Sequence, residues 1–100
     1  MRHAQHYALI WRDGKCSVGE DHVIAKSYCK RKRLTLGLLR LNGSSRVVYS
    51  FKVNGLWKPQ GTIIDTNDHE NNRRAAFRDF FRYLLHNQDE FSIVRLPVNG

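Results

Sequence analysis

The sequence predicts an α+β fold in which a small antiparallel sheet packs on one main helix. Three β-like segments follow one another in the middle of the chain, an amphipathic helical segment comes next, and further β-like segments lie near both ends. The chain has 100 residues, of which 41% are hydrophobic and 26% charged. These values favour a globular protein over a disordered one, and we expect residues 1–100 to form a single small basic domain.

The central segments predict a three-stranded meander over about 33–64. They are RLTLGLLRL (33–41), RVVYSFKV (46–53) and LWKPQGTII (56–64). NGSS at 42–45 and NG at 54–55 separate them, and Asn-Gly suits a type I′ turn because both central residues of that turn need a positive φ. Pro59 cannot donate a ladder hydrogen bond, so the third strand should lie at an edge or be interrupted there.

Counting back from these turns predicts the register. It pairs Leu36 with Phe51, Leu38 with Tyr49, Lys52 with Trp57 and Val53 with Leu56. One face, expected to take the helix, then collects Leu34, Leu36, Leu38, Val47, Tyr49, Phe51, Val53 and Leu56. The other face collects Thr35, Gly37, Leu39, Arg46, Val48, Ser50, Lys52 and Trp57. A slip of one residue would exchange the two faces.

The hydrophobic period changes after the meander, and predicts a helix over about 67–87. Apolar residues recur at i, i+3, i+4, i+7 and i+8, at Phe77, Phe80, Phe81, Leu84 and Leu85. Asn67 and Glu70 have the spacing of a capping box, and Asp68 suits the positive end of the helix.

The remaining segments predict flanking strands. HYALIWR (6–12) alternates in polarity and is followed by Asp13–Gly14, a strong hairpin signal, with a return strand from near Lys15. FSIVRLP (91–97) predicts a last strand near 91–96, which Pro97 stops. HVIAKSY (22–28) is interpreted as another strand or the close of a loop. No helix or strand is predicted for the rest of 13–32.

The charge distribution points to a polyanionic partner. The net charge is +8, and residues 22–64 contain nine cations and no acid. These cations are Lys26, Lys30, Arg31, Lys32, Arg33, Arg40, Arg46, Lys52 and Lys58. Such a field attracts polyanions, and nucleic acid gains affinity from counterion release when phosphates are neutralised. An acidic protein surface is an alternative, and a simple solubility device is another.

The candidate nucleic-acid site combines these cations with one aromatic ring. We expect phosphate contacts from Lys30, Arg31, Lys32, Arg33, Arg40, Arg46, Lys52 and Lys58, with Trp57 stacking on a base or packing on a sugar. The alternatives are a solvated loop at Lys30–Arg33 and a packing role for Trp57. In a eukaryotic protein the same four cations could act as a nuclear-localisation signal.

A secondary basic stripe is predicted on the amphipathic helix. Arg74, Arg78 and Arg82 recur every four residues, which places them in one row. Asp79 is close enough in sequence to pair with part of this charge, so an ordinary solvated helix surface is the alternative interpretation.

No metal, cofactor or catalytic site is expected. Cys16, His22 and Cys29 do not have the spacing of a zinc site. Asp65, Asp68, His69 and Glu70 gather where a helix start favours acids for capping. The chain contains neither a P-loop nor a dinucleotide-binding glycine motif.

The sequence also predicts a compartment. Cys16 and Cys29 are expected to be reduced thiols, because small secreted domains usually carry more cysteines. No apolar run reaches the roughly 20 residues of a membrane span, and the start of the chain does not look like a signal peptide. We therefore expect a soluble, intracellular protein that is cytoplasmic, or nuclear in a eukaryote.

These observations favour a non-enzymatic nucleic-acid-binding accessory protein that contacts the phosphate backbone of DNA or RNA with low sequence specificity. The first alternative is a protein-interaction module, such as an inhibitor or adaptor of phage or mobile-element type, that docks on an acidic protein surface. A homodimer built through sheet edges would favour it. The second alternative is a metal-independent, toxin-like ribonuclease that uses His, Lys, Arg and Tyr side chains.

Overall fold

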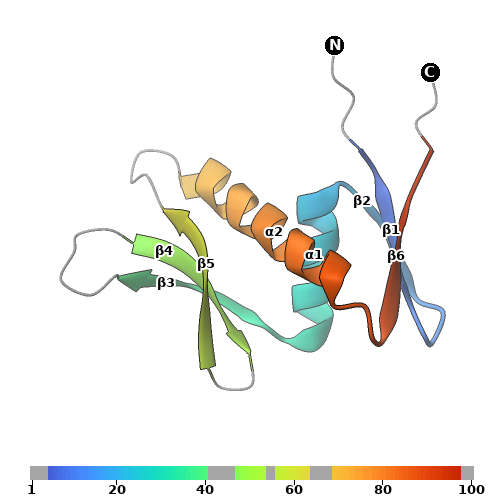
Figure 1. Ribbon diagram of the computed structural model, residues 1–100, viewed down its shortest axis with the longest axis horizontal. Helices are drawn as coiled ribbons and strands as arrows, with labels where there is room; N and C mark the ends of the chain where they lie inside the picture. Colours follow the sequence, from blue (N-terminus) through green and yellow to red (C-terminus); the bar gives the residue numbers. More distant parts are fainter. Residues whose placement is uncertain (1–4, 41–46, 54–55, 64–68, 98–100) are drawn as a thin grey trace, which may run out of the picture.

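The computed structural model describes residues 5–40, 47–53, 56–63 and 69–97, with side chains described over 5–34 and 70–97. The elements follow in the order β1 (Tyr7–Trp11), β2 (Cys16–Gly19), α1 (Asp21–Lys32), β3 (Thr35–Arg40), β4 (Val47–Val53), β5 (Leu56–Ile63), α2 (His69–His86) and β6 (Phe91–Arg95). The α+β class predicted from the sequence is confirmed. Figure 1 shows the two helices between two groups of strands.

The strands form two antiparallel sheets where the sequence analysis expects one. The first sheet has the order β2-β1-β6, and the second has the order β3-β4-β5. The strands predicted near 6–12 and 91–96 are present, but they pair with each other and do not extend the meander. The reason is α1, which separates β2 from β3 along the chain and leads it away from the first sheet (Figure 1).

The first sheet is built around β1, and its hairpin confirms the turn signal at Asp13–Gly14. The Trp11 amide donates to the Lys15 carbonyl over 2.9 Å, and the Gly14 amide donates to the Trp11 carbonyl over 2.9 Å. Gly14 has a φ of 90°, a conformation that glycine adopts without steric cost. The register then places Ala8 opposite Val18 of β2 and Val94 of β6.

Helix α1 occupies the segment that the sequence analysis assigns to a strand or a loop, so that expectation is wrong. Ile24, Ala25 and Cys29 are buried and Tyr28 is half-buried. Their spacing of i, i+1, i+4 and i+5 makes one helix face. The adjacent β-branched Val23 and Ile24 favour a strand locally, but burial of this face against the core overrides that preference.

The meander has the predicted register. Leu36 lies opposite Phe51, Leu38 opposite Tyr49, Lys52 opposite Trp57 and Val53 opposite Leu56. β5 is an edge strand, and its register with β4 becomes irregular beyond the pair formed by Ser50 and Pro59, as expected for a proline in a strand. The predicted turns at 42–45 and 54–55 lie outside the described residues. The side chains of the meander also lie outside the described ones, so the prediction of which face packs on α2 stays a prediction.

Helix α2 falls within the predicted range. The stripe residues Phe77, Phe80, Phe81 and Leu84 are buried, while Leu85 is 38% exposed. α2 contacts α1 and also β5 of the second sheet. The predicted capping residues Asn67 and Asp68 lie outside the described residues, and Glu70 lies in the first turn.

One core joins the first sheet to both helices. Its buried members are Leu9, Trp11, Ile24, Ala25, Cys29, Phe77, Phe80, Phe81, Leu84 and Phe91. Aromatic contacts run through it. The Trp11 and Tyr28 rings stack with centroids 5.5 Å apart, and Tyr28 meets Phe91 edge-on at 5.4 Å. This aromatic cluster positions the C-terminal half of α1 on β1.

A tight junction between β2 and α1 gives a first prediction. A Cβ atom at Gly19 would lie 2.7 Å from Cγ1 and 2.9 Å from Cβ of Val23. Gly19→Ala should therefore reduce the free energy of unfolding by about 1–3 kcal/mol, measured by urea denaturation. Val18→Ala, on the same strand and 58% exposed, is the control and should change it by less than about 0.5 kcal/mol. Equal stability of Gly19→Ala and the unmodified chain would contradict the packing described.

Candidate nucleic-acid interface

The geometry of α1 divides the four consecutive cations into two pairs. Each residue of an α-helix is rotated by about 100° from the one before it. Arg31 and Lys32 therefore turn toward β1, on the side that carries Tyr28. Lys30 is exposed and lies on the other side of the helix, while the exposed Arg33 is the C-cap, in the left-handed conformation, and does not follow this rotation. The cluster belongs to a helix terminus, not to a solvated loop or the start of a strand.

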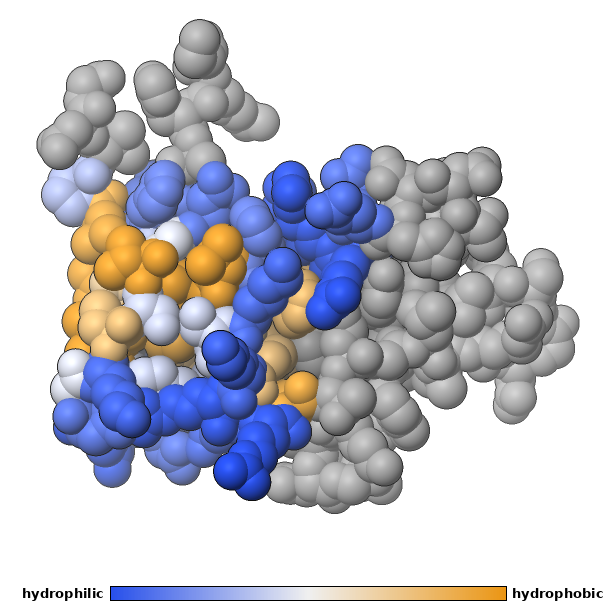
Figure 2. Space-filling model, turned by 180° about the vertical axis from the view of Figure 1, so that it is seen from behind, coloured by the Kyte–Doolittle hydropathy of each residue, from blue (hydrophilic) through white to orange (hydrophobic). Residues whose placement is uncertain are grey.

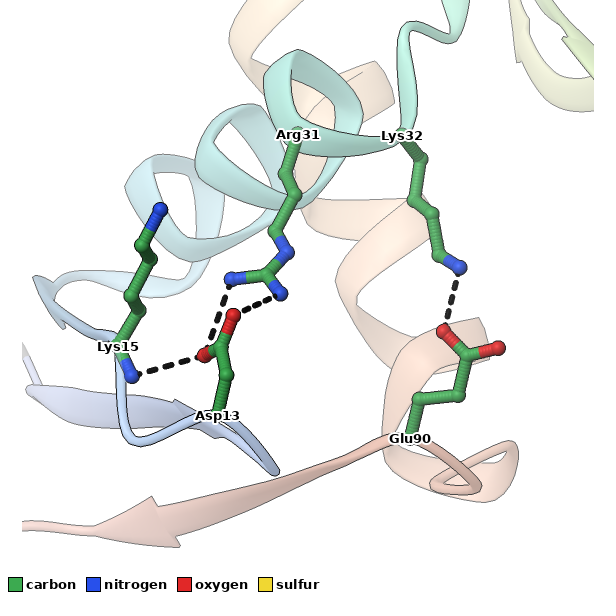
Figure 3. A network of polar contacts seen from close by, with 5 residues as sticks. All are labelled: Asp13, Lys15, Arg31, Lys32 and Glu90. Atoms are coloured by element: carbon green, nitrogen blue, oxygen red, sulfur yellow. Dashed lines mark hydrogen bonds and ion pairs between the residues drawn. The ribbon is translucent and has the colours of Figure 1, made fainter.

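Arg31 covers the aromatic core. Its guanidinium carbon lies 4.1 Å from the centre of the Trp11 ring, and the guanidinium donates two hydrogen bonds to the Asp13 carboxylate, the shorter of 2.5 Å. The Lys15 amide donates to the same carboxylate over 3.0 Å (Figure 3). The hydrogen bond from Arg31 holds the pKa of Asp13 below its usual range. Arg31 thus ties the end of α1 to the β1–β2 turn.

Lys32 makes a second tie, to the segment between α2 and β6. Its ammonium Nζ lies 2.5 Å from Oε2 of Glu90 (Figure 3). This hydrogen bond lowers the pKa of Glu90 and raises the pKa of Lys32. Two of the four predicted phosphate ligands, Arg31 and Lys32, therefore already have carboxylate partners on other elements of the fold.

The outward pair belongs to a longer row along α1. Lys26 and Lys30 are exposed and have the spacing i and i+4, which places them on one helix face, and the exposed Arg33 follows at the C-cap in the left-handed conformation. Within the described side chains, no carboxylate forms an ion pair with any of these three cations.

Helix α2 adds cations beside this row. The Phe77 ring lies between the two helices, with Nζ of Lys26 5.7 Å and the guanidinium carbon of Arg73 5.9 Å from its centre. Arg74, the next residue, is exposed. We call these five residues the helical basic surface: Lys26, Lys30, Arg33, Arg73 and Arg74. Figure 2, which views the molecule from the α1 side, shows strongly hydrophilic side chains as a band between orange side chains and the grey region.

The predicted secondary stripe is exposed at all three positions, but it is partly paired. Arg78 Nε lies 3.7 Å from Oδ1 of Asp21 on α1, and Arg82 Nη1 lies 3.9 Å from Oδ1 of Asp79. The pairing with Asp79 expected from the sequence is confirmed. Because exposed ion pairs of this kind contribute little, Arg78 and Arg82 can exchange these partners for another anion at small cost.

The meander cations lie at two ends of the second sheet. Lys52 is opposite both Thr35 and Trp57, so these three residues form a row two positions after Arg33. Lys58 is opposite Phe51 in the next row. Arg40 ends β3, about 17 Å from Thr35 at the usual rise per residue, and so does not join the α1 cluster. Arg46 lies outside the described residues.

The groups considered for metal or nucleophilic chemistry are dispersed. Cys16 is exposed on β2, whereas Cys29 is buried in the core, where burial raises the pKa of its thiol to about 12. His22 lies 3.4 Å from Asp21 and 3.7 Å from Glu20, measured from its Nδ1. Among the described residues, no three potential metal ligands come together. Asp65 and Asp68 lie outside them.

The outer face of the first sheet is mostly apolar, with Cys16 and Ser92 opposite Ile10, and carries no charged residue within β1, β2 and β6. Val18, Ile10 and Val94 are exposed there, around the small Ala8 side chain. Orange side chains gather beside the hydrophilic band in Figure 2. Over the described ranges, neither helix has the length and hydrophobicity of a membrane-spanning segment.

Sequence reasoning left Lys26 and Arg73 out of the site. Lys26 was counted among the cations, but its relation to Lys30 and Arg33 appears only once 21–32 is a helix. The burial pattern of Ile24, Ala25, Tyr28 and Cys29 is the signal that would have revealed it. Arg73 joins through the Phe77 contact, which no local pattern encodes.

Comparisons with protein-family models, with curated proteins and with solved structures find no match to this chain. Function is therefore inferred from the residues of this chain alone.

The ties made by Asp13 and Glu90 predict a pH dependence of stability. Both carboxyl pKa values are lowered in the folded protein. The ion pairs therefore stabilise the folded state fully at a pH above the ordinary carboxyl pKa of about 4. This contribution is lost as the pH falls through the lowered pKa values. Asp13→Asn/Glu90→Gln should have a lower Tm than the unmodified chain at pH 7. The difference should shrink as the pH falls from about 5 to about 2.5, as measured by circular dichroism. A difference that stays constant over this range would contradict the assignment.

Proposed function

We propose that this protein binds nucleic acid by contacting the phosphate backbone, with low sequence specificity and without catalysing a reaction. One observation carries the proposal: Lys26 and Lys30 are exposed on one face of α1, Arg33 is exposed at its C-cap, and none of the three is paired with a described carboxylate. Lysine and arginine bind phosphates and release condensed counterions, which supplies most non-specific affinity. We expect such a protein to act inside a cell, where nucleic acid is available.

The backbone at Arg33 supports a role for its side chain. Arg33 has φ 55° and ψ 40°, the left-handed conformation in which glycine usually ends a helix. The Leu34 amide donates to the Cys29 carbonyl over 2.9 Å, which closes this terminus. A residue with a Cβ costs about 1 kcal/mol there. Lys30, Arg31 and Lys32 already place positive charge in the last turn, so the helix dipole gives little reason for a fourth cation.

The rest of the proposed interface extends from α1 in two directions. Arg73 and Arg74 extend it over α2. We include Lys52 and Trp57 of the second sheet, because Lys52 is opposite Thr35, which follows two positions after Arg33. Lys52 would bind phosphate, and Trp57 would stack on a base or pack on a sugar. The exposed row of α1 contains no Asn or Gln to read adenine edges, which suits binding of low specificity.

The second prediction concerns the salt dependence of binding. Lys26→Gln/Lys30→Gln should weaken binding of a fluorescein-labelled oligonucleotide and lower the slope of log affinity against log salt by about 1.4–1.8, because two phosphate contacts are lost. Anisotropy titrations at several salt concentrations measure both quantities. Lys15→Gln/Arg95→Gln removes the same charge from exposed positions in the β1–β2 turn and on β6, and should leave the slope within about 0.5 of the unmodified chain.

Other outcomes distinguish the alternatives. If the unmodified chain binds neither duplex nor single-stranded probes at low salt, the proposal is wrong and an acidic protein surface becomes the partner to seek. If labelled RNA is cleaved by the pure protein, the non-enzymatic part of the proposal is wrong. Equal slopes for the two double variants would show that binding does not use the face of α1.

The third prediction separates folding from binding at one residue. Arg33→Gly should raise the free energy of unfolding by about 0.5–1 kcal/mol, because glycine relieves the left-handed backbone. The same variant should bind the oligonucleotide several-fold more weakly, since one phosphate contact is lost. Denaturant unfolding and anisotropy measure the two effects. A variant that is more stable and binds as tightly as the unmodified chain would remove Arg33 from the interface.

A further inference from the structure

A small cavity of about 160 Å³ lies where the ends of α1 and α2 meet the start of β6. Tyr28 and Lys32 line it from α1, and Tyr83 lines it from α2. Asn87, Glu90 and Phe91 complete most of its wall. The cavity therefore combines three aromatic rings with groups that donate and accept hydrogen bonds.

The charges of this wall exclude phosphate as the occupant. Among the described residues, Lys32 is the one cation that lines the cavity, and it is already paired with Glu90. Asp89 adds a second carboxylate to the lining. A phosphate would thus meet net negative charge, whereas a planar, uncharged heterocycle with N–H groups could donate to these carboxylates and stack on the rings.

Tyr83 is suited to act as the stacking platform. It is 52% exposed, while Phe80 packs against it with ring centres 5.7 Å apart and an angle of 27° between the planes. The buried Phe80 therefore holds the exposed ring in place. A ring fixed before binding loses little conformational freedom when a base stacks on it.

The position of the cavity relative to Lys30 favours single-stranded over duplex nucleic acid as the ligand. The cavity lies on the side of α1 that carries Tyr28 and Lys32, while Lys30 lies on the opposite side of the helix. A strand that uses both must bend around the end of α1, within a helix diameter of about 10–12 Å. Duplex DNA has a persistence length of about 50 nm and resists such a bend, but a single strand can follow it.

We propose that the ligand of the helical basic surface is single-stranded nucleic acid, with one base inserted into the cavity beside Tyr83. This inference rests on the proposed nucleic-acid binding and specifies its substrate class. Lys30 holds a phosphate on one side of the helix end, Arg33 holds another at the C-cap, and the next base enters the cavity on the other side.

Anisotropy measurements of binding test this inference. The probes are labelled dT and dA 12-mers and a 12-base-pair duplex, and the proteins are the unmodified chain, Tyr83→Leu and Tyr83→Phe. Tyr83→Leu should weaken single-strand binding about five- to hundred-fold, the effect of one base–ring stack, without changing the salt slope, because no charge is removed. Tyr83→Phe keeps the ring and should retain most of the affinity. The duplex should bind more weakly than the single strands and should respond little to either variant.

Failure of this inference and failure of the proposed function give different results. Single-strand affinity that is unchanged in Tyr83→Leu, or duplex binding at least as tight as single-strand binding, would overturn the base-insertion proposal while leaving phosphate binding intact. The absence of binding to any probe by the unmodified chain would overturn both. Circular dichroism of each variant shows whether a loss of affinity reflects unfolding.

Discussion

The contact between the Arg31 guanidinium and the Trp11 ring fixes the last turn of α1 on the first sheet. Trp11 is buried and stacks on Tyr28, so Arg31 covers a core in which both helices take part. A cation over an aromatic ring contributes about 0.5–2 kcal/mol, and an exposed ion pair alone contributes less. Three contacts made within one turn, to Trp11, Asp13 and Glu90, hold the helix end more firmly than any of them alone.

The rotation of the remaining cations follows from this attachment. Once Arg31 and Lys32 are directed toward β1, the helix period turns Lys30 to the other side, in line with Lys26, and the exposed Arg33 follows at the C-cap. The same run of four residues thus serves two purposes, because two cations stabilise the fold and two are left for a partner. Neither a solvated loop nor an extended segment would separate them in this way.

The extent to which the sequence predicted this arrangement depended on the range of the interactions involved. The meander register was predictable because short turns and a period of two determine it, and α2 was predictable because its stripe of phenylalanines has a helical period. Helix α1 was not, because Val23 and Ile24 favour a strand and the cations of its last turn hide the spacing of its short apolar face. Because α1 was not predicted, the division into two sheets was not predicted either. The helix at this point leads the chain away from β2.

The candidate site shows the same division. The sequence predicted the basic cluster and the register that joins Lys52 to Trp57. The partners of Arg31 and Lys32 are Asp13 and Glu90, which are 18 and 58 residues away along the chain. No local pattern encodes such pairs. For the same reason the cavity beside Tyr83, built from α1, α2 and β6, could be recognised only in the folded protein.

The most direct measurement compares two neutralised pairs within the same run, Arg31→Gln/Lys32→Gln and Lys30→Gln/Arg33→Gln. Each double variant removes two positive charges from the same four-residue run, so the total charge and the region of the chain are matched. We expect the first to lower the Tm clearly and the second to lower oligonucleotide affinity and its salt slope while leaving the Tm unchanged within about 2 °C. Equal effects of the two variants on both Tm and affinity would contradict the division of this cluster into structural and binding cations.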